Sequence, residues 1–203
     1  MGVSCVVHWK PSEGRNPTQR LELLQSRIET LGGKSLGTWI VDCETLQSSP
    51  ALGGGGPQKL VHMLHSSEYP LTTFAVLDSN KCLVAENTLD TIFLHLRQFY
   101  AQRKGHKVDV KGVHYDLNDK YIVKVGSVVI GSSNKGIIVE TEDKHSSESS
   151  CWEPLSDFVR GLLQNSAPIT SPSFPPRPYA TADTMIYYAN VFTELRKVGP
   201  IIK

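Results

Sequence analysis

Three apolar segments follow one another between Val108 and Thr141, and they restrict the possible fold more than any other part of the sequence. Before Gly112 the alternating apolar residues have even numbers (Val108, Val110), and after it they have odd numbers, from Val113 to Leu117. The alternation changes again at Gly126, from odd numbers before it to even numbers after it. Side chains in a strand alternate between two faces, so a change of parity predicts a bulge or bend at each glycine. We therefore expect a strongly curved, barrel-like antiparallel sheet in this region.

The first two of these segments are separated by Asn118 and Asp119. Both residue types tolerate a positive φ, which the short turns of β-hairpins require at their central positions. We therefore predict a hairpin with these two residues at its centre. This turn would place Gly112 opposite Val125 in the paired strands.

The rest of the chain alternates between strand-like and helix-like patterns. Alternating or continuous apolar runs predict strands at 2–9, 38–43, 60–64, 71–77 and 82–85. Apolar residues at helical spacing predict helices at 17–31, 87–103, 152–163 and 183–197. Because strands dominate the first two thirds and helices gather late, the order favours the α+β class with flanking helices and a C-terminal helix.

We expect residues 1–203 to form one domain, because 203 residues are enough for a single substantial domain. Within it, residues 166–182 form a proline-rich linker that leads to the C-terminal helix at 183–197. Prolines are too frequent in the linker for a helix or a central strand; they are Pro168, Pro172, Pro175, Pro176 and Pro178.

Charge and cysteine content narrow the classes of function. The chain has 21 Lys and Arg residues and 20 Asp and Glu residues. This balance leaves no excess of positive charge for direct binding to nucleic acid or to an anionic membrane. No apolar run approaches the roughly 20 residues of a membrane helix. The four cysteines are scattered without a C-x-x-C pair, which suits a reducing intracellular compartment.

One segment carries a pattern with possible chemistry. On a strand, Glu140, Glu142 and Lys144 would project from one face, as in tunnel-type triphosphatases that hold a divalent cation and a phosphate. The alternative is a solvated strand end that leads into a polar loop. A tunnel of this kind also needs many Lys and Arg side chains, which a net charge of +1 does not supply.

Other candidate motifs do not assemble into a site. His62 and His65 are three residues apart in a strand, so they point to opposite faces and make a poor metal pair. Cys43 lies between two acidic residues, which is the opposite of what activates a thiolate. From the residues alone we expect no catalytic, cofactor-binding or metal-binding residues, and a non-enzymatic interaction domain.

Several local strings together resemble the Mediator complex subunit 20 family, also called the TRF-proximal protein family. They occur in the family's order and extend over nearly the whole chain. The strings are MGVSCV at 1–6, GT at 37–38 with VDCET at 41–45, SEYPL at 67–71, VKVGSV at 123–128 and DTM at 183–185.

This resemblance implies a non-catalytic subunit in the head module of the Mediator coactivator complex, which regulates RNA polymerase II transcription in the nucleus. It implies a heterodimer with Mediator subunit 18, contact with a C-terminal segment of subunit 8 and with other head-module subunits, and no cofactor. The implied fold is similar to that of the triphosphate-tunnel enzymes. In those enzymes, however, the acidic motif lies on an early strand, whereas Glu140 lies late in this chain.

The sequence also suggests where a partner would dock. The segment from Tyr121 to Ile130 is apolar on both faces. Each face of such a strand has to be shielded from water by other side chains. One hypothesis is that a partner covers one face and contacts Tyr121, Val123, Val125, Val128 and Ile130. The alternative is that the helices at 152–163 and 183–197 cover it from within the same chain.

Overall fold

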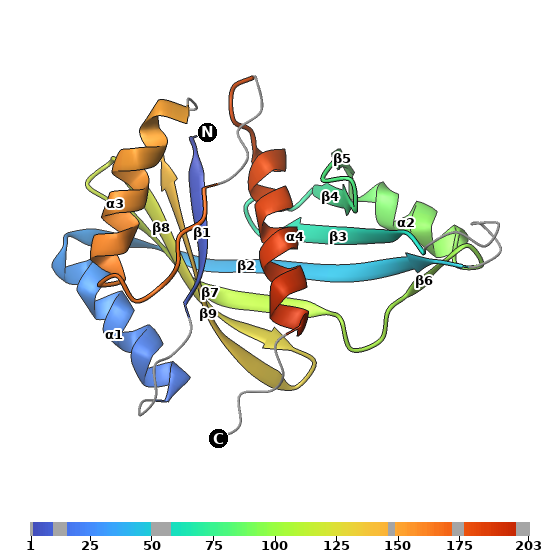
Figure 1. The fold of residues 1–203 in the computed structure, drawn as a ribbon, viewed down its shortest axis with the longest axis horizontal. Coiled ribbons are helices and arrows are strands. Elements are labelled where there is room, and N and C mark those ends of the chain that lie inside the picture. The colour runs from blue at the N-terminus through green and yellow to red at the C-terminus, as the bar shows by residue number, and fades with distance from the viewer. Residues whose placement is uncertain (1, 10–15, 50–57, 146–148, 172–176, 198–203) are drawn as a thin grey trace.

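The computed structural model describes residues 2–9, 16–49, 58–145, 149–171 and 177–197. Within these ranges the chain forms one curved sheet with helices on both of its faces (Figure 1). The strands are β1 (Ser4–Trp9), β2 (Gly33–Ser48), β3 (Leu60–Ser66), β4 (Thr72–Leu77), β5 (Cys82–Glu86), β6 (Tyr100–Gln102), β7 (Val108–Leu117), β8 (Tyr121–Ile130) and β9 (Ser133–Asp143). The helices are α1 (Pro17–Thr30), α2 (Thr88–His95), the short 3₁₀ helix η2 (Ser149–Cys151), α3 (Trp152–Leu162) and α4 (Thr181–Lys197).

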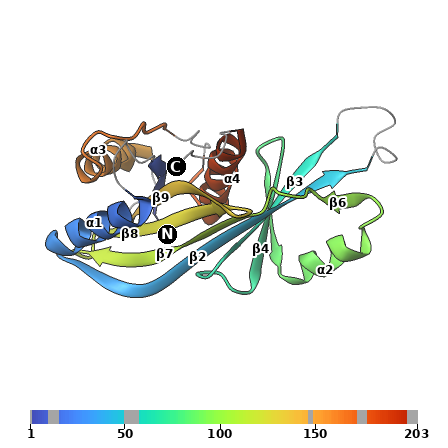
Figure 2. The same cartoon turned by 90° about the horizontal axis from the view of Figure 1, so that it is seen from below.

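The sheet is antiparallel throughout, with the strand order β1-β9-β8-β7-β2-β3-β4-β5, and β6 pairs with β2. β2 crosses almost the whole molecule, because its first part pairs with β7 and its last part with β3 and β6 (Figure 1). Figure 2 shows the strong curvature of β2 and β7. The predicted α+β class with a curved antiparallel sheet is confirmed, but the sheet is not closed into a barrel.

Local sequence signals explain where the first helix begins and ends. Asn16 has an extended backbone, and its side chain accepts a hydrogen bond from the Thr18 amide at 3.2 Å. Pro17 at the first helical position needs no amide partner. The helix ends before Gly32, whose φ of +94° is a conformation that glycine adopts without strain.

The prediction for α2 was wrong in length. We expected a helix at 87–103, but α2 ends at His95. The chain then turns, and β6 pairs with Leu46–Ser48 at the end of β2. The rings of Tyr100 and Phe93 meet edge-on, with their centroids 5.5 Å apart. Tyr100 therefore keeps an apolar neighbour in α2 while its backbone joins the sheet. Pairing with β2 therefore overrides the helical periodicity of the local sequence.

Different helices cover the two faces of β8. Val123 and Val125 belong to a buried cluster with Leu24 of α1 and Leu155 of α3. Val128 belongs to a second buried cluster on the other face, which α4 covers with its apolar side chains. The alternation along β8 is regular, and the parity of the apolar set changes because the covering helix changes.

The expected bulges at Gly112 and Gly126 are therefore absent, and the pairing of β7 with β8 passes both glycines without a shift of register. The register shifts lie instead in β2, between Ser35 and Gly37, and in β9, where Lys135 is the extra residue opposite Val128 and Val129. Asn118 and Asp119 do form the turn, with φ values of 53° and 59°. The predicted pairing was one residue off, because Gly112 faces Gly126 and not Val125.

The facing glycines allow a close approach of two backbones. A Cβ atom on Gly112 would lie 1.9 Å from the carbonyl oxygen of Val125, and one on Gly126 would lie 3.0 Å from the ring of Trp39. Trp39 pairs with Gly112 from the neighbouring strand β2 and is fully buried. The indole thus occupies the space beside Gly126 that a side chain there would need.

The described parts of the linker and its proline content agree with an irregular conformation between α3 and α4. Trp9 donates from its indole nitrogen to the Ser166 hydroxyl at 2.8 Å, and the Tyr187 hydroxyl donates to the Thr170 carbonyl at 2.6 Å. Residues 172–176 lie outside the described residues, and the division of the chain at 166–182 stays a prediction. None of the described helices is long and apolar enough to cross a membrane.

We predict that Gly112→Ala destabilises the protein by about 3 kcal/mol or more, because the new methyl group meets rigid backbone rather than a movable side chain. Chemical denaturation of the purified variant would measure this loss. Gly161→Ala in α3 is the matched control, because nothing lies within 4 Å of its added Cβ, and it should raise stability by up to about 1 kcal/mol. Equal stability of the two variants would contradict the proposed close approach.

Candidate functional site

The sequence pattern at Glu140 leads to a buried ion pair. Glu140 in β9 lies directly opposite Lys124 in β8, and the Lys124 ammonium donates to Glu140 Oε1 at 3.0 Å. The two side chains are only 3% and 4% exposed. The ammonium also donates to the carboxylate of Glu68, which lies in the turn between β3 and β4. Two carboxylates therefore surround one buried cation.

The second oxygen of Glu140 is used as well. The hydroxyl of Tyr188 in α4 donates to Glu140 Oε2 at 2.6 Å. Burial and the adjacent Glu140 carboxylate raise the pKa of Tyr188 well above its usual value, so the hydroxyl remains a donor. This hydrogen bond fixes the middle of α4 to β9.

The charge state of Lys124 follows from its neighbours. Burial disfavours the ammonium, but the carboxylates of Glu140 and Glu68 outweigh this effect and raise the pKa of Lys124. The group is therefore a permanent cation in the interior. A lysine available as a general base would need the opposite shift.

The three residues of the predicted tunnel motif have separate partners. Glu142 accepts from the Gly2 amide at 2.9 Å, and burial raises its pKa. Lys144 forms ion pairs with Asp116 at 3.0 Å and with Asp119 at the hairpin turn. Glu140 is held by Lys124 as described. The described residues contain no group of three or more His, Cys, Asp or Glu side chains that could hold a metal ion.

His62 and His65 point to opposite faces of the sheet, as predicted. The His62 ring nitrogen Nδ1 lies 3.1 Å from the Thr45 hydroxyl and 3.3 Å from Arg196 of α4. Burial and the Arg196 charge lower the pKa of His62 to about 4, so this imidazole is neutral and accepts both hydrogen bonds. Arg196 also donates to the carbonyl of His106, at 3.0 and 2.8 Å, and so fixes the end of α4.

His65 is instead held between two carboxylates. Its Nδ1 lies 3.1 Å from Asp42 of β2, and its Nε2 lies 3.0 Å from Asp90 of α2. The hydrogen bond to Asp42 and the charges of both carboxylates raise the pKa of His65 to about 9. The imidazolium therefore ties α2 to the sheet on the face opposite α4.

The buried cysteine near these histidines shows no sign of activation. Cys43 lies 3.4 Å from the Arg196 guanidinium. Burial nevertheless raises the pKa of its thiol to about 11. A thiol of this kind packs as a small apolar side chain.

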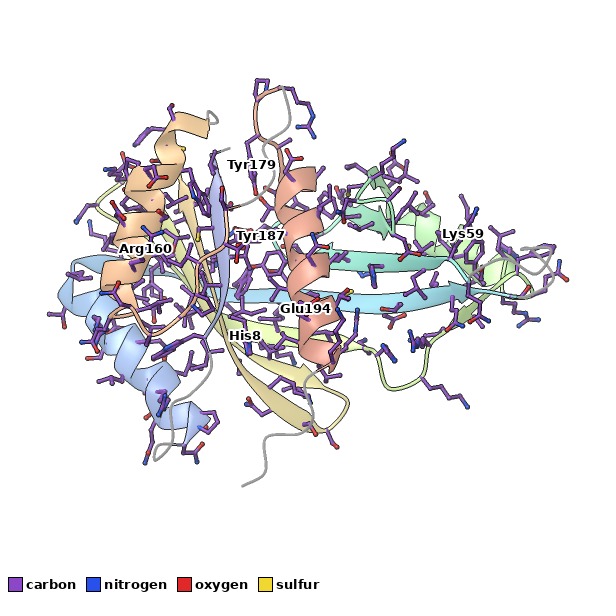
Figure 3. The ribbon with its side chains drawn as sticks, in the orientation of Figure 1. His8, Lys59, Arg160, Tyr179, Tyr187 and Glu194 are labelled. Carbon is purple, nitrogen blue, oxygen red and sulfur yellow. The ribbon has the colours of Figure 1, made fainter. Side chains whose placement is uncertain are left out.

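A groove of about 820 Å³ runs between β1 and α4. Figure 3 labels His8 on β1 and Tyr187 and Glu194 on α4, which line it. His8 donates from Nε2 to the Lys135 carbonyl at 2.8 Å, and the Tyr187 hydroxyl is bound to the linker. Burial raises the pKa of Tyr187. Both side chains are therefore engaged in hydrogen bonds within the chain.

The side chains predicted to contact a partner are mostly covered within the chain. Tyr121, Val123, Val125 and Val128 are at most 6% exposed, and Ile130 is partly buried against the second cluster. Within the described chain, α1 and α3 pack in the cluster that contains Val123 and Val125, and α4 packs in the cluster that contains Val128. The contact of a partner with these side chains stays a prediction.

Sequence reasoning missed the residues that complete the polar clusters, namely Glu68, Tyr188 and Arg196. The one signal for them was Lys124, a single cation in the middle of an apolar strand, because a buried charge needs partners. Its partners lie 56 and 16 residues away in the sequence, which no local pattern reveals.

Comparisons with known proteins agree with one another. A family model described as "TATA-binding related factor (TRF) of subunit 20 of Mediator complex" matches residues 1–193. The chain is 37% identical over 203 residues to Mediator of RNA polymerase II transcription subunit 20 from Mus musculus, covering 97% of this chain and 95% of the relative. For the subunit 20 of Xenopus laevis the identity is 36%, with 97% and 96% covered.

Among solved structures, one chain of the "Structure of the Schizosaccharomyces pombe Mediator head module" is 10% identical and has a TM-score of 0.43. The match covers 82% of this chain and 96% of that chain. A TM-score this low adds nothing to the assignment of the family.

We predict that Glu140→Gln destabilises the fold by about 3–5 kcal/mol, because it leaves a buried cation with one anion fewer. Tyr188→Phe should cost about 1–3 kcal/mol, since it leaves Glu140 Oε2 without its donor. Chemical denaturation measures both losses. The control is Lys144→Gln, which removes an ion pair open to solvent and should therefore cost much less stability than Glu140→Gln. Comparable losses for all three variants would contradict the buried network.

The raised pKa of His65 predicts a pH dependence of stability. The folded protein binds the proton more tightly than the unfolded chain, so this contribution is complete below pH 6.5 and is lost as the pH rises through about 9. We expect His65→Gln to be less stable than the unchanged protein near pH 6. The difference should shrink near pH 10 (about one pH unit above the folded pKa) in denaturation experiments. A constant difference across this range would show that His65 is not held as an imidazolium.

Proposed function

Because the chain belongs to the Mediator subunit 20 family, we propose that it acts as a non-catalytic subunit in the head module of the Mediator complex and regulates RNA polymerase II transcription through contacts with other proteins. The family resemblance seen in the sequence strings is confirmed by the match over residues 1–193. A place in nuclear transcription follows from this membership, and we propose the nucleus as the location.

The hydrogen bonds of the Glu140 carboxylate support a role without catalysis. Both of its oxygens are bound inside the protein, one by Lys124 and one by Tyr188. A hydrolase of the tunnel type would need this carboxylate free for a divalent cation. The alternative of a metal-dependent triphosphate hydrolase is therefore not favoured.

The proposal extends to specific partners. We propose a heterodimer with Mediator subunit 18 and a further contact with a C-terminal segment of subunit 8, as the family resemblance implies. Of the predicted contact residues, Ile130 is the one that the chain's own core leaves partly exposed. It ends β8 and pairs with Ser133 beside the turn at Gly131, so we place the subunit 18 contact at this end of the β8–β9 hairpin.

We predict that the chain and Mediator subunit 18 co-elute from a sizing column at micromolar concentration after co-expression. Ile130→Asp should abolish co-elution, because a carboxylate would have to be buried in an apolar contact. Leu36→Asp is the matched control, since Leu36 is 52% exposed and lies beside the opposite end of β7. Thermal melts would verify that both variants fold.

Two separately eluting monomers would contradict the proposed heterodimer. Co-elution that survives Ile130→Asp but not Leu36→Asp would move the contact to the other end of the sheet.

A further inference from the structure

α2 is a helix that its own chain covers poorly. Half of its eight residues are apolar, yet none of them is buried. Ile92 is 52% exposed and Leu94 is 70% exposed. Surface helices normally bury an apolar stripe, so this helix presents apolar surface that nothing in the described chain covers.

This exposure belongs to a larger pattern. The described residues include ten large apolar side chains that are clearly exposed, and seven of these lie between Leu71 and Phe99. Figure 1 shows that this part of the chain, which contains β4, β5 and α2, forms one end of the molecule. Single exposed apolar residues are ordinary, but such a concentration marks an interaction surface.

A groove of about 480 Å³ opens beside α2. The aromatic rings of Phe93 and Tyr100 meet edge-on at one side of it. Its apolar floor comes from the third and smallest buried cluster, whose neighbours Phe93 and Tyr100 are themselves only partly buried. The residues that define this surface, which we call the α2 groove, are Leu46, Met63, Phe93, Leu94, Arg97 and Tyr100.

The segment that follows Asp90 and forms one side of the α2 groove is rich in cations. Residues 91–107 contain four Lys or Arg residues and no Asp or Glu, a formal charge of +4 in a chain of net charge +1. The rest of the chain is therefore slightly acidic, at −3. Arg97 lines the groove, and Arg103 and Lys104 directly follow Gln102, which also lines it. No ion pair holds Arg97, Arg103 or Lys104 within the described part of the chain.

The carboxylates at the groove already have cationic partners, although His65 is shared with Asp42 and Lys107 with Asp109. Asp90 is paired with His65, and Glu44 with Lys107 at 3.4 Å. Thr73 also donates to Asp90 at 3.2 Å. Arg97 and the nearby Arg103 and Lys104 are thus the charges without an ion-pair partner among the described residues, and an anionic ligand fits them.

We propose that the α2 groove binds an acidic peptide segment with large apolar side chains, supplied by another protein. The apolar side chains would enter between Phe93, Leu94 and Tyr100, while the carboxylates of the segment would pair with Arg97, Arg103 and Lys104. This inference names a second kind of partner for the protein-contact role proposed above and lies at a different surface from the proposed subunit 18 contact.

The geometry favours a peptide over a nucleic acid. The groove has an apolar floor lined by Leu46, Met63 and Leu94, whereas a nucleic-acid site combines cations with exposed aromatic faces along a polar track. The two rings at the groove meet edge-on, so they do not offer parallel faces for stacked bases.

The test uses the full chain and a short fluorescein-labelled peptide in which aspartates alternate with leucines and phenylalanines. We expect saturable binding by fluorescence anisotropy that weakens as salt is raised, because these cationic side chains are exposed. Leu94→Glu and Arg97→Glu should each weaken binding at least about tenfold. The matched controls are Leu36→Glu and Lys34→Glu, which change an exposed leucine and a cation at the start of β2, away from the α2 groove, and should leave the affinity unchanged.

Three results would overturn the proposal. They are equal binding of a peptide with lysines in place of the aspartates, unchanged affinity in Leu94→Glu and Arg97→Glu, and stronger binding of a single-stranded oligonucleotide that displaces the peptide. The measurement is repeated on the co-purified pair with subunit 18. Retained binding supports a separate surface, whereas loss of binding would show that subunit 18 itself covers the α2 groove. The peptide test on the chain alone does not depend on whether the heterodimer forms.

Discussion

The buried ammonium of Lys124 imposes the strongest single constraint on this fold. A cation in the interior is tolerated only when anions and hydrogen bonds surround it. The neighbouring strand supplies Glu140, the turn before β4 supplies Glu68, and α4 supplies Tyr188 to complete Glu140. Three parts of the chain that are distant in sequence therefore have to meet at one point, and any displacement of α4 would leave a buried carboxylate oxygen without its donor.

The sequence predicted the features that depend on local chemistry. The turn at Asn118 and Asp119 and the antiparallel hairpins follow from residues within a few positions of one another. The parity change in β8 was seen but misinterpreted, because the pattern reports which face is buried and not why. A helix that covers one face at one end of a strand, and another helix that covers the other face further along, produce the same pattern as a bulge.

The candidate site shows the limit of such reasoning more sharply. Glu140, Glu142 and Lys144 were identified together from their spacing, and the structure places them near three different sets of partners. The spacing of carboxylates along a strand fixes the face on which they lie but says nothing about the groups that approach that face. Glu140 is distinguished from a metal ligand only by Lys124 and Tyr188, and neither contact can be read from the neighbouring sequence.

α4 joins two parts of the sheet that are covered to different degrees. Tyr188 in the middle of the helix binds Glu140, and Arg196 in its last turn binds the His106 carbonyl beyond β6. Around Tyr188 the sheet has helices on both faces. Near His65, the face that lies opposite α4 carries only α2, which is short and poorly buried. Because the part of the sheet around Tyr188 is held by buried contacts, the part that carries α2 can leave apolar side chains exposed without loss of the fold. That arrangement suits a protein that acts by contacting others, because the exposed surface is held in place by contacts that binding does not disturb.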